Sequence, residues 1–204
     1  MRAIDWRRIE TRMSIAPEYI GKKFCNFDVG FNKQKVKAAE IEHAARNRRW
    51  IILSGDDPGV GKTHLAIAAM KLSWRMDRAP EPPFYETEAV PDEDSYRFIP
   101  MRDWGQRIVS AGYRAEEIWD ETVNGCRCLL LDDLGFEPER CNCHISRLVD
   151  DYYRRQRQLI ITTNLDADGL VYRYGGAIVD RIIGKAGRII EMTGRSYRQQ
   201  GDGR

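Results

Sequence analysis

The chain has 204 residues, a length that favours one domain with a sizeable core over two domains. Hydrophobic residues make up 42% and charged residues 31%, which excludes a disordered or fibrous protein, and the net charge of +2 excludes an overall basic surface for nucleic acid. No apolar run is long enough to cross a bilayer, and the charged first ten residues do not resemble a signal peptide, so we expect a cytoplasmic protein.

Short apolar runs alternate with helical stretches along the chain, which is typical of a mostly parallel sheet with helices on both faces. The runs expected to form strands are residues 50–54, 97–101, 128–131, 159–163 and 189–192. The stretches expected to form helices are residues 34–46, 63–76, 103–111, 114–122 and 144–157. The pattern therefore predicts an α/β fold.

A phosphate-binding loop follows the first expected strand directly. Residues 55–63 read Gly-Asp-Asp-Pro-Gly-Val-Gly-Lys-Thr and lead into a helix. Glycines let successive backbone N–H groups curl around a phosphate, and the helix N-terminus adds partial positive charge. Lys62 is expected to bridge the β- and γ-phosphates of ATP, and the Thr63 hydroxyl to hold Mg²⁺. The expected ATP-binding residues are Gly59, Val60, Gly61, Lys62, Thr63 and His64.

The loop departs from the usual pattern at one position, because Asp56 stands where a glycine is expected, five residues before Gly61. Either the loop carries one extra residue after Gly55, or Asp56 itself adopts the backbone conformation that glycine favours. We expect the carboxylates of Asp56 and Asp57 to point into solvent, because they would repel a triphosphate.

Residues 77–94 differ from the rest in composition, with seven acidic residues, one basic residue and four prolines. Neither a helix nor a strand accommodates this composition well, so an exposed loop is expected. A solvated connector is the simpler interpretation, and a binding element stays open because the segment is long for a loop.

The expected strand at residues 128–131 ends in two carboxylates. Because ligands gather at the carboxyl ends of parallel strands, Asp132 is expected to hold Mg²⁺ through its water shell. Asp133 is expected to orient and deprotonate the attacking water, with Glu137 as the next candidate for that base. An ordinary junction of strand and turn is the alternative, and the phosphate loop upstream argues against it.

The cysteines are odd in number and the chain is large enough to need no disulfides, so we expect reduced thiols. A zinc site is conceivable from a set of neighbouring residues, namely Cys126, Cys128, Cys141, Cys143 and His144. The spacing within each cysteine pair is short for structural zinc, and Cys128 opens a strand that needs apolar side chains. Buried or incidental thiols are therefore the preferred interpretation.

Four stretches together resemble the AAA+ ATPases of the DnaC helicase-loader and IstB transposition-helper type; they are residues 55–66, 130–135, 160–165 and 194–198. The resemblance implies an AAA+ core of the P-loop NTPase class over residues 16–198, with a five-stranded parallel sheet and no separate lid domain. It also implies ATP hydrolysis at interfaces between subunits of a homo-oligomeric ring or spiral.

The resemblance implies catalytic roles for two more residues. Asn164 would be the polar sensor that touches the γ-phosphate or the attacking water, with a turn or helix cap before Asp166 as the alternative. Arg181 would be an arginine finger offered to a neighbouring subunit, with a surface salt bridge as the alternative. Family members often carry a second arginine four residues before this one, where this chain has Ala177.

The partners implied are single-stranded DNA and a replicative helicase or a transposase. In the family the DNA groove is lined by the helical region that corresponds to residues 104–124, whose arginines and aromatic residues suit phosphate contact and base stacking. Trp104 and Trp119 equally suit a core. Residues 1–15 are expected to form a short arm with an amphipathic docking helix, and residues 199–204 a flexible tail.

The leading hypothesis is an Mg²⁺-dependent ATPase that remodels or loads a DNA replication complex. A transposition helper is the alternative within the same class. A small P-loop kinase is a second alternative, and residues 162–164 and the helix of Arg181 argue against it. A nucleotide-regulated scaffold with little hydrolysis is the third, suggested by Asp56 and by an aspartate at position 133 where many AAA+ proteins have glutamate.

Overall fold

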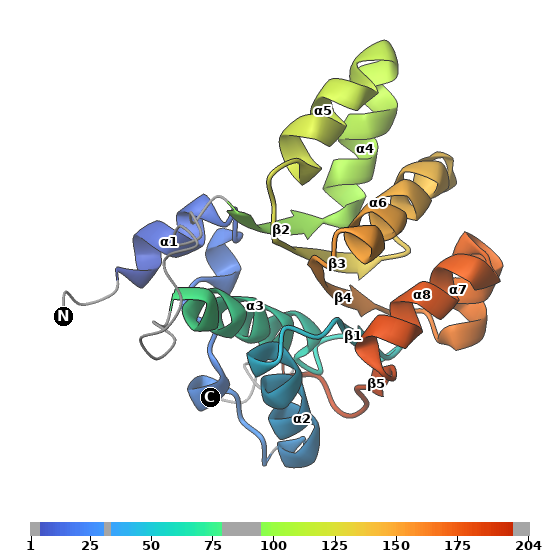
Figure 1. Ribbon diagram of the computed structural model, residues 1–204. Helices are drawn as coiled ribbons and strands as arrows, with labels where there is room; N and C mark the ends of the chain where they lie inside the picture. Colours follow the sequence, from blue (N-terminus) through green and yellow to red (C-terminus); the bar gives the residue numbers. More distant parts are fainter. Residues whose placement is uncertain (1–4, 31–33, 79–94, 198–204) are drawn as a thin grey trace.

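The computed structural model describes residues 5–30, 34–78 and 95–197 (Figure 1). The strands are β1 (Ile51–Ser54), β2 (Tyr96–Pro100), β3 (Cys128–Leu134), β4 (Gln158–Thr163) and β5 (Ile190–Glu191). The helices are α1 (Trp6–Arg12), α2 (Lys35–Arg46), α3 (Lys62–Arg78), α4 (Met101–Ala111), α5 (Ala115–Val123), α6 (Asn142–Arg154), α7 (Ala167–Tyr174) and α8 (Gly176–Ala186). Most of the expected acidic loop, residues 79–94, and the expected tail lie outside the described residues.

The strands form one parallel sheet in the order β2-β3-β4-β1-β5. β1 lies between β4 and β5, with Ile51 beside Ile160 and Leu53 beside Ile190. The predicted α/β fold with five parallel strands is thus confirmed. Across the described ranges, no helix has the length and apolar character needed to span a membrane.

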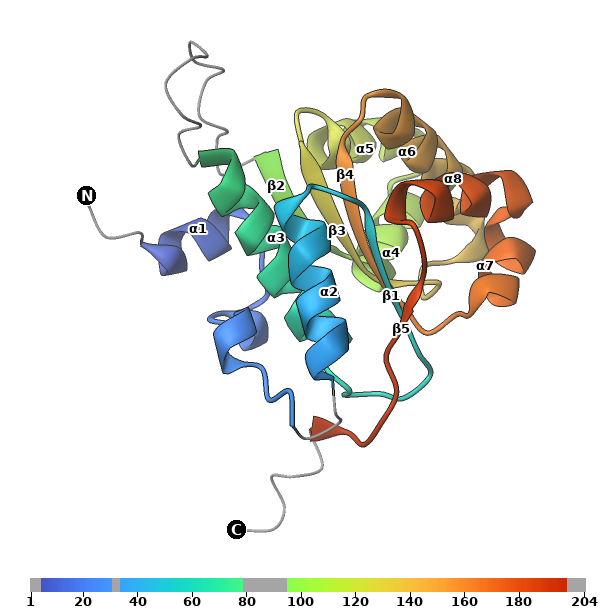
Figure 2. The same ribbon diagram turned by 60° about the horizontal axis from the view of Figure 1, so that its bottom comes forward.

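Helices cover both faces of the sheet, with α1, α2 and α3 on one side and α4 to α8 on the other (Figures 1 and 2). Successive side chains of β3 enter the two cores in turn, since Leu130 packs with α3 and Leu131 with α4 and α6. A strand buried on both faces needs a continuous apolar run, which explains the sequence of β3.

Residues 5–15 pack against the sheet layer and do not extend as a free arm. Met13 and Ile15 are buried in the core that contains α3, and Trp6 meets Trp74 of α3 edge to face at 5.5 Å. The Phe98 N–H also donates to the Met13 carbonyl at 2.8 Å, which ties the segment to β2. The apolar side of α1, which a docking helix would offer to a partner, is therefore already covered.

Trp104 and Trp119 are core residues, each 3% exposed, on the inner faces of α4 and α5. Of the two interpretations, the structure therefore favours the core for both tryptophans. Arg107, Tyr113 and Arg114 remain exposed on the same pair of helices and the turn between them. Tyr113 is 95% exposed at that turn.

Candidate functional site

A cleft of about 700 Å³ lies where the carboxyl ends of β1, β3 and β4 meet. Parallel strands bring these ends to one edge of the sheet, so segments far apart in sequence converge there. All but one of the predicted site residues line this cleft: Gly59, Val60, Gly61, Lys62, Thr63, His64, Asp132, Asp133 and Asn164.

Lys62 opens α3 directly after the glycines of the loop. Its ammonium donates to the Gly55 carbonyl and, at 3.3 Å, to the Asp57 carbonyl, so it rests on the loop that a phosphate would occupy. Burial lowers the pKa of the Lys62 ammonium, while the carboxylate of Asp133 opposes that shift. If an anion bound here, the Lys62 ammonium would give up its hydrogen bonds to neutral carbonyls and form an ion pair with the anion.

Gly55 adopts the unusual backbone conformation, with φ of 147°, while Asp56 does not have a positive φ. A Cβ at Gly55 would stand 2.0 Å from the Met192 carbonyl oxygen, because β5 pairs closely with the end of β1 there. Of the two possibilities raised by the sequence, the structure therefore favours a loop with one extra residue after Gly55.

The prediction that Asp56 and Asp57 both point into solvent is wrong for Asp57. Asp56 is exposed, but the Asp57 carboxylate accepts a hydrogen bond from the Gly194 N–H at 2.9 Å. The segment after β5 returns across the loop, where the Tyr197 N–H also donates to the Gly59 carbonyl at 2.9 Å. Asp57 thus fastens this segment to the phosphate loop.

Three hydroxyl and carboxyl groups connect the loop to the end of β3. The Thr63 and Thr162 hydroxyls both donate to Asp132 Oδ1, at 2.9 and 2.7 Å, and the Asp133 N–H donates to the Thr162 hydroxyl at 2.9 Å. Burial raises the pKa of Asp132 to about 6. A hydroxyl beside a carboxylate is a hard oxygen pair of the kind that Mg²⁺ prefers, so Thr63 and Asp132 fit this ion.

Asp133 and Asn164 stand on the open side of the cleft. Asp133 is exposed and has a φ of 58°, a conformation that aspartate tolerates, which turns it away from the buried Asp132. Asn164 directly follows β4 and is half-buried. The alternative role as a helix cap falls to Asp166, whose carboxylate accepts from the Gly169 N–H at 2.8 Å and begins α7, a helix that the sequence analysis did not predict.

Arg181 is the predicted site residue that is not among the described residues lining the cleft. It lies on α8, with its Nε 3.0 Å from Asp150 Oδ1 of α6 and its Nη1 donating to the Ala177 carbonyl. The salt bridge considered as an alternative is thus present within the chain.

Glu137, the second candidate for the base, is 2% exposed and is not among the described residues that line the cleft. Its carboxylate accepts from the Tyr174 hydroxyl, from the Arg173 guanidinium and, at 2.9 Å, from the Gly135 N–H. Because these bonds hold it against α7, it is unsuited to activating a water in the cleft.

Sequence reasoning missed one whole wall of the cleft. Phe27 packs against the His64 ring at 5.2 Å and the Tyr197 ring at 5.7 Å, and a Cβ on Gly61 would stand 2.5 Å from the Phe27 ring. Arg102 also lines the cleft, with its guanidinium 5.1 Å from the ring centre of Phe136. Tyr197 belongs to the closing stretch of the resemblance, whereas no motif marks Phe27.

The cysteines lie apart from the cleft. Cys126, Cys128 and Cys141 are buried, and the Cys126 and Cys141 thiols each donate to a backbone carbonyl at 3.5 Å. Burial raises the pKa of the Cys128 thiol. Within the described ranges, no three histidine, cysteine or acidic side chains gather as metal ligands would.

No protein-family model and no curated protein sequence matches the chain significantly. Among solved structures, the DnaC helicase loader matches with a TM-score of 0.68 at 22% sequence identity, over 87% of this chain and 100% of that one. DnaI matches with a TM-score of 0.69 at 16% identity, over 93% and 98% of the two chains. The replication initiator DnaA bound to AMPPCP and single-stranded DNA matches with a TM-score of 0.62 at 22% identity, over 87% of this chain and 50% of that one. The chain therefore shares its fold with these three proteins, in agreement with the fold that the resemblance implied.

Proposed function

We propose that this chain is an Mg²⁺-dependent ATPase that remodels or loads a DNA replication complex. The observation that carries the proposal is the meeting of Lys62, Thr63, Asp132, Asp133 and Asn164 at one cleft, from three strands that are distant in sequence. The likeness in fold to a helicase loader and to a nucleotide-bound replication initiator supports the same class of function.

In this proposal each side chain of the cleft has one task. Lys62 leaves the loop carbonyls and binds the β- and γ-phosphates, while Asn164 orients the attacking water. Asp133, which is exposed, accepts the proton of that water. Thr63 and Asp132 hold Mg²⁺, which when bound neutralises charge that develops on the phosphates.

Thr162 connects the Asp132 carboxylate to the backbone of Asp133 in this arrangement. Its hydroxyl donates to Asp132 Oδ1 and accepts from the Asp133 N–H, so a shift of the Asp132 carboxylate would be passed to the backbone that carries Asp133. Asp132 has a pKa of about 6 and is mostly ionised at neutral pH, as a metal ligand must be.

Single-stranded DNA is the nucleic acid we propose as partner, at the exposed end of α4 and α5. Tyr113 offers a free aromatic face there, and Arg107 and Arg114 are exposed beside it, which suits base stacking and phosphate contact. A replicative helicase is the proposed protein partner, with a transposase as the alternative.

The test is ATP binding and phosphate release, with and without single-stranded DNA. Lys62→Ala should abolish ATP binding, because the phosphates lose their main positive charge, whereas Lys35→Ala, which removes an exposed lysine of α2, should bind like the parent. Equal ATP affinity in the Lys62 variant would remove the phosphate-loop assignment. Binding without phosphate release would instead support a nucleotide-regulated scaffold, and release that requires an added acceptor would support a kinase.

A further inference from the structure

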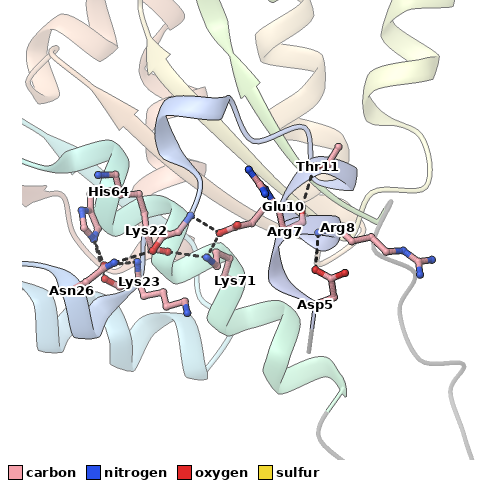
Figure 3. A network of polar contacts seen from close by, with 11 residues as sticks. Asp5, Arg7, Arg8, Glu10, Thr11, Lys22, Lys23, Asn26, His64 and Lys71 are labelled. Atoms are coloured by element: carbon pink, nitrogen blue, oxygen red, sulfur yellow. Dashed lines mark hydrogen bonds and ion pairs between the residues drawn. The ribbon is translucent and has the colours of Figure 1, made fainter. Parts of the chain in front are cut away.

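A buried ion pair joins α1 to α3 (Figure 3). The Lys71 ammonium of α3 contacts the Glu10 carboxylate of α1, and the two side chains are only 3% and 2% exposed. Burial lowers the pKa of Lys71, and the Glu10 carboxylate opposes that shift. Because removing two charges from water is costly, such a pair adds little net stability compared with apolar residues, so its geometry suggests a positioning role.

Both partners of the pair also bind the backbone of one short turn. Glu10 Oε1 accepts a hydrogen bond from the Gly21 N–H at 3.0 Å, and the Lys71 ammonium donates to the Lys22 carbonyl at 3.0 Å. The Trp6 ring lies 4.9 Å from the ammonium and covers it from outside. The turn at Gly21 and Lys22 is therefore held by both members of the ion pair (Figure 3).

This turn leads directly into the residues that form the Phe27 wall of the cleft. Asn26 accepts from the Lys23 N–H at 2.8 Å and donates to the Gly21 carbonyl at 2.9 Å, and His64 contacts the Lys23 carbonyl at 2.9 Å. Lys22, Asn26 and Phe27 then line the cleft beside the phosphate loop. The wall thus depends on the pair through backbone hydrogen bonds.

We propose that Glu10 and Lys71 are positioning residues that hold the wall of residues 21–27 for the nucleoside part of the ligand. This inference rests on the proposed function, because it needs a nucleotide in the cleft. The phosphates engage the loop at residues 59–63, whereas the hydrogen bonds that the described chain shows for the pair join Glu10 to Lys71 and both to the turn at Gly21 and Lys22. The pair should therefore affect binding of the nucleoside and not binding of the phosphates. Because Glu10 belongs to α1, a nucleoside in the cleft should also stabilise the position of α1.

The test compares ATP with inorganic tripolyphosphate, which carries the phosphates without a nucleoside. In the double variant Glu10→Gln/Lys71→Met both charges are removed together, so no unpaired charge remains buried. We expect its ATP affinity to fall about tenfold or more by calorimetry, and its tripolyphosphate affinity to stay within about twofold of the parent. Glu116→Gln is the matched control, because it opens the exposed pair of Glu116 with Arg147 and should change neither affinity.

A second measurement uses the parent chain alone. Amide hydrogen exchange in α1 should slow when ATP binds and should not slow when tripolyphosphate binds. ATP affinity equal to the parent in the double variant, an equal loss of both ligands, or an α1 that exchanges alike with both ligands would overturn the inference. A parent chain that binds neither ligand would instead overturn the proposed function.

Discussion

Asp132 and Asp133 are adjacent in the sequence but lie in different environments. It is 5% exposed and receives two threonine hydroxyls, whereas Asp133, the next residue, is exposed. The left-handed backbone of Asp133 separates the two side chains, so one carboxylate is buried against the threonines and the other faces solvent. Two adjacent aspartates thus differ in burial and in hydrogen bonding because the backbone turns between them.

The raised pKa of Asp132 makes stability depend on pH. A carboxyl with a folded pKa of about 6 and an ordinary value of 3.8 favours the folded state when protonated, so its contribution is lost as the pH rises from about 4 to about 6. Asp132→Asn keeps an oxygen that accepts from both threonines and removes the charge. At pH 7.5, without nucleotide or Mg²⁺, it should raise the free energy of unfolding by on the order of 2 kcal/mol.

Urea unfolding at pH 7.5 and at pH 4 measures this effect. The difference between Asp132→Asn and the parent should shrink markedly at pH 4, where the parent carboxyl is itself largely protonated. An equal difference at both values would show that packing, and not charge, separates the two proteins.

At the scale of elements, the junction of β1, the phosphate loop and β5 depends on a single glycine. Gly55→Ala would place a methyl group 2.0 Å from the Met192 carbonyl and require a φ that alanine rarely adopts. We expect the free energy of unfolding to fall by about 2 to 4 kcal/mol in denaturant titration, with weaker ATP binding because β5 moves from the loop.

Gly176→Ala is the matched control for that substitution. Gly176 is at the start of α8, and no atom outside its own helix turn lies within 4 Å of a Cβ built there. Alanine favours a helix over glycine, so this variant should be at least as stable as the parent. A loss in Gly176→Ala as large as that in Gly55→Ala would show that the strain at β5 is not the cause.

The elements that the sequence predicted best are those with local signals. The phosphate loop, the strand before Asp132 and the alternating apolar runs depend on neighbouring residues, and all appear in the structure within a few positions of their expected bounds. The wall built by Phe27 and Tyr197 depends on contacts between distant ends of the described chain. The Asp57 hydrogen bond to Gly194 is equally distant, which is why spacing and composition placed this carboxylate in solvent.

The proposed role of Arg181 depends on how subunits assemble. Its pair with Asp150 is about one-third exposed on both sides, so opening it would cost about 1 kcal/mol or less. Because α8 lies apart from the cleft of its own chain, a trans role requires head-to-tail packing of subunits. Arg181→Ala should then bind ATP like the parent and hydrolyse it on the order of 10³-fold more slowly.

Mixing two inactive variants tests that role. Asp133→Asn should keep ATP affinity and lose turnover, because its amide cannot accept the proton of the attacking water. An interface between the two variants can pair an intact Asp133 with an intact Arg181, so phosphate release should recover in part on mixing. A mixture that assembles and stays inactive would restrict Arg181 to its salt bridge with Asp150.

The order of strands also determines when, during synthesis, the strand before the phosphate loop can pair with its neighbours. Both neighbours of β1 come late in the chain, since it pairs with β4 and β5. A ribosome that has translated residues 1–157 has therefore completed the phosphate loop and neither of the strands that flank β1. Long-range parallel pairing of this kind forms slowly, so the nascent chain exposes an unpaired β1 until β4 and β5 have been synthesised. If the chain binds ATP as proposed, ATP would stabilise only the folded form, so it could not assist folding before β5 has emerged from the ribosome.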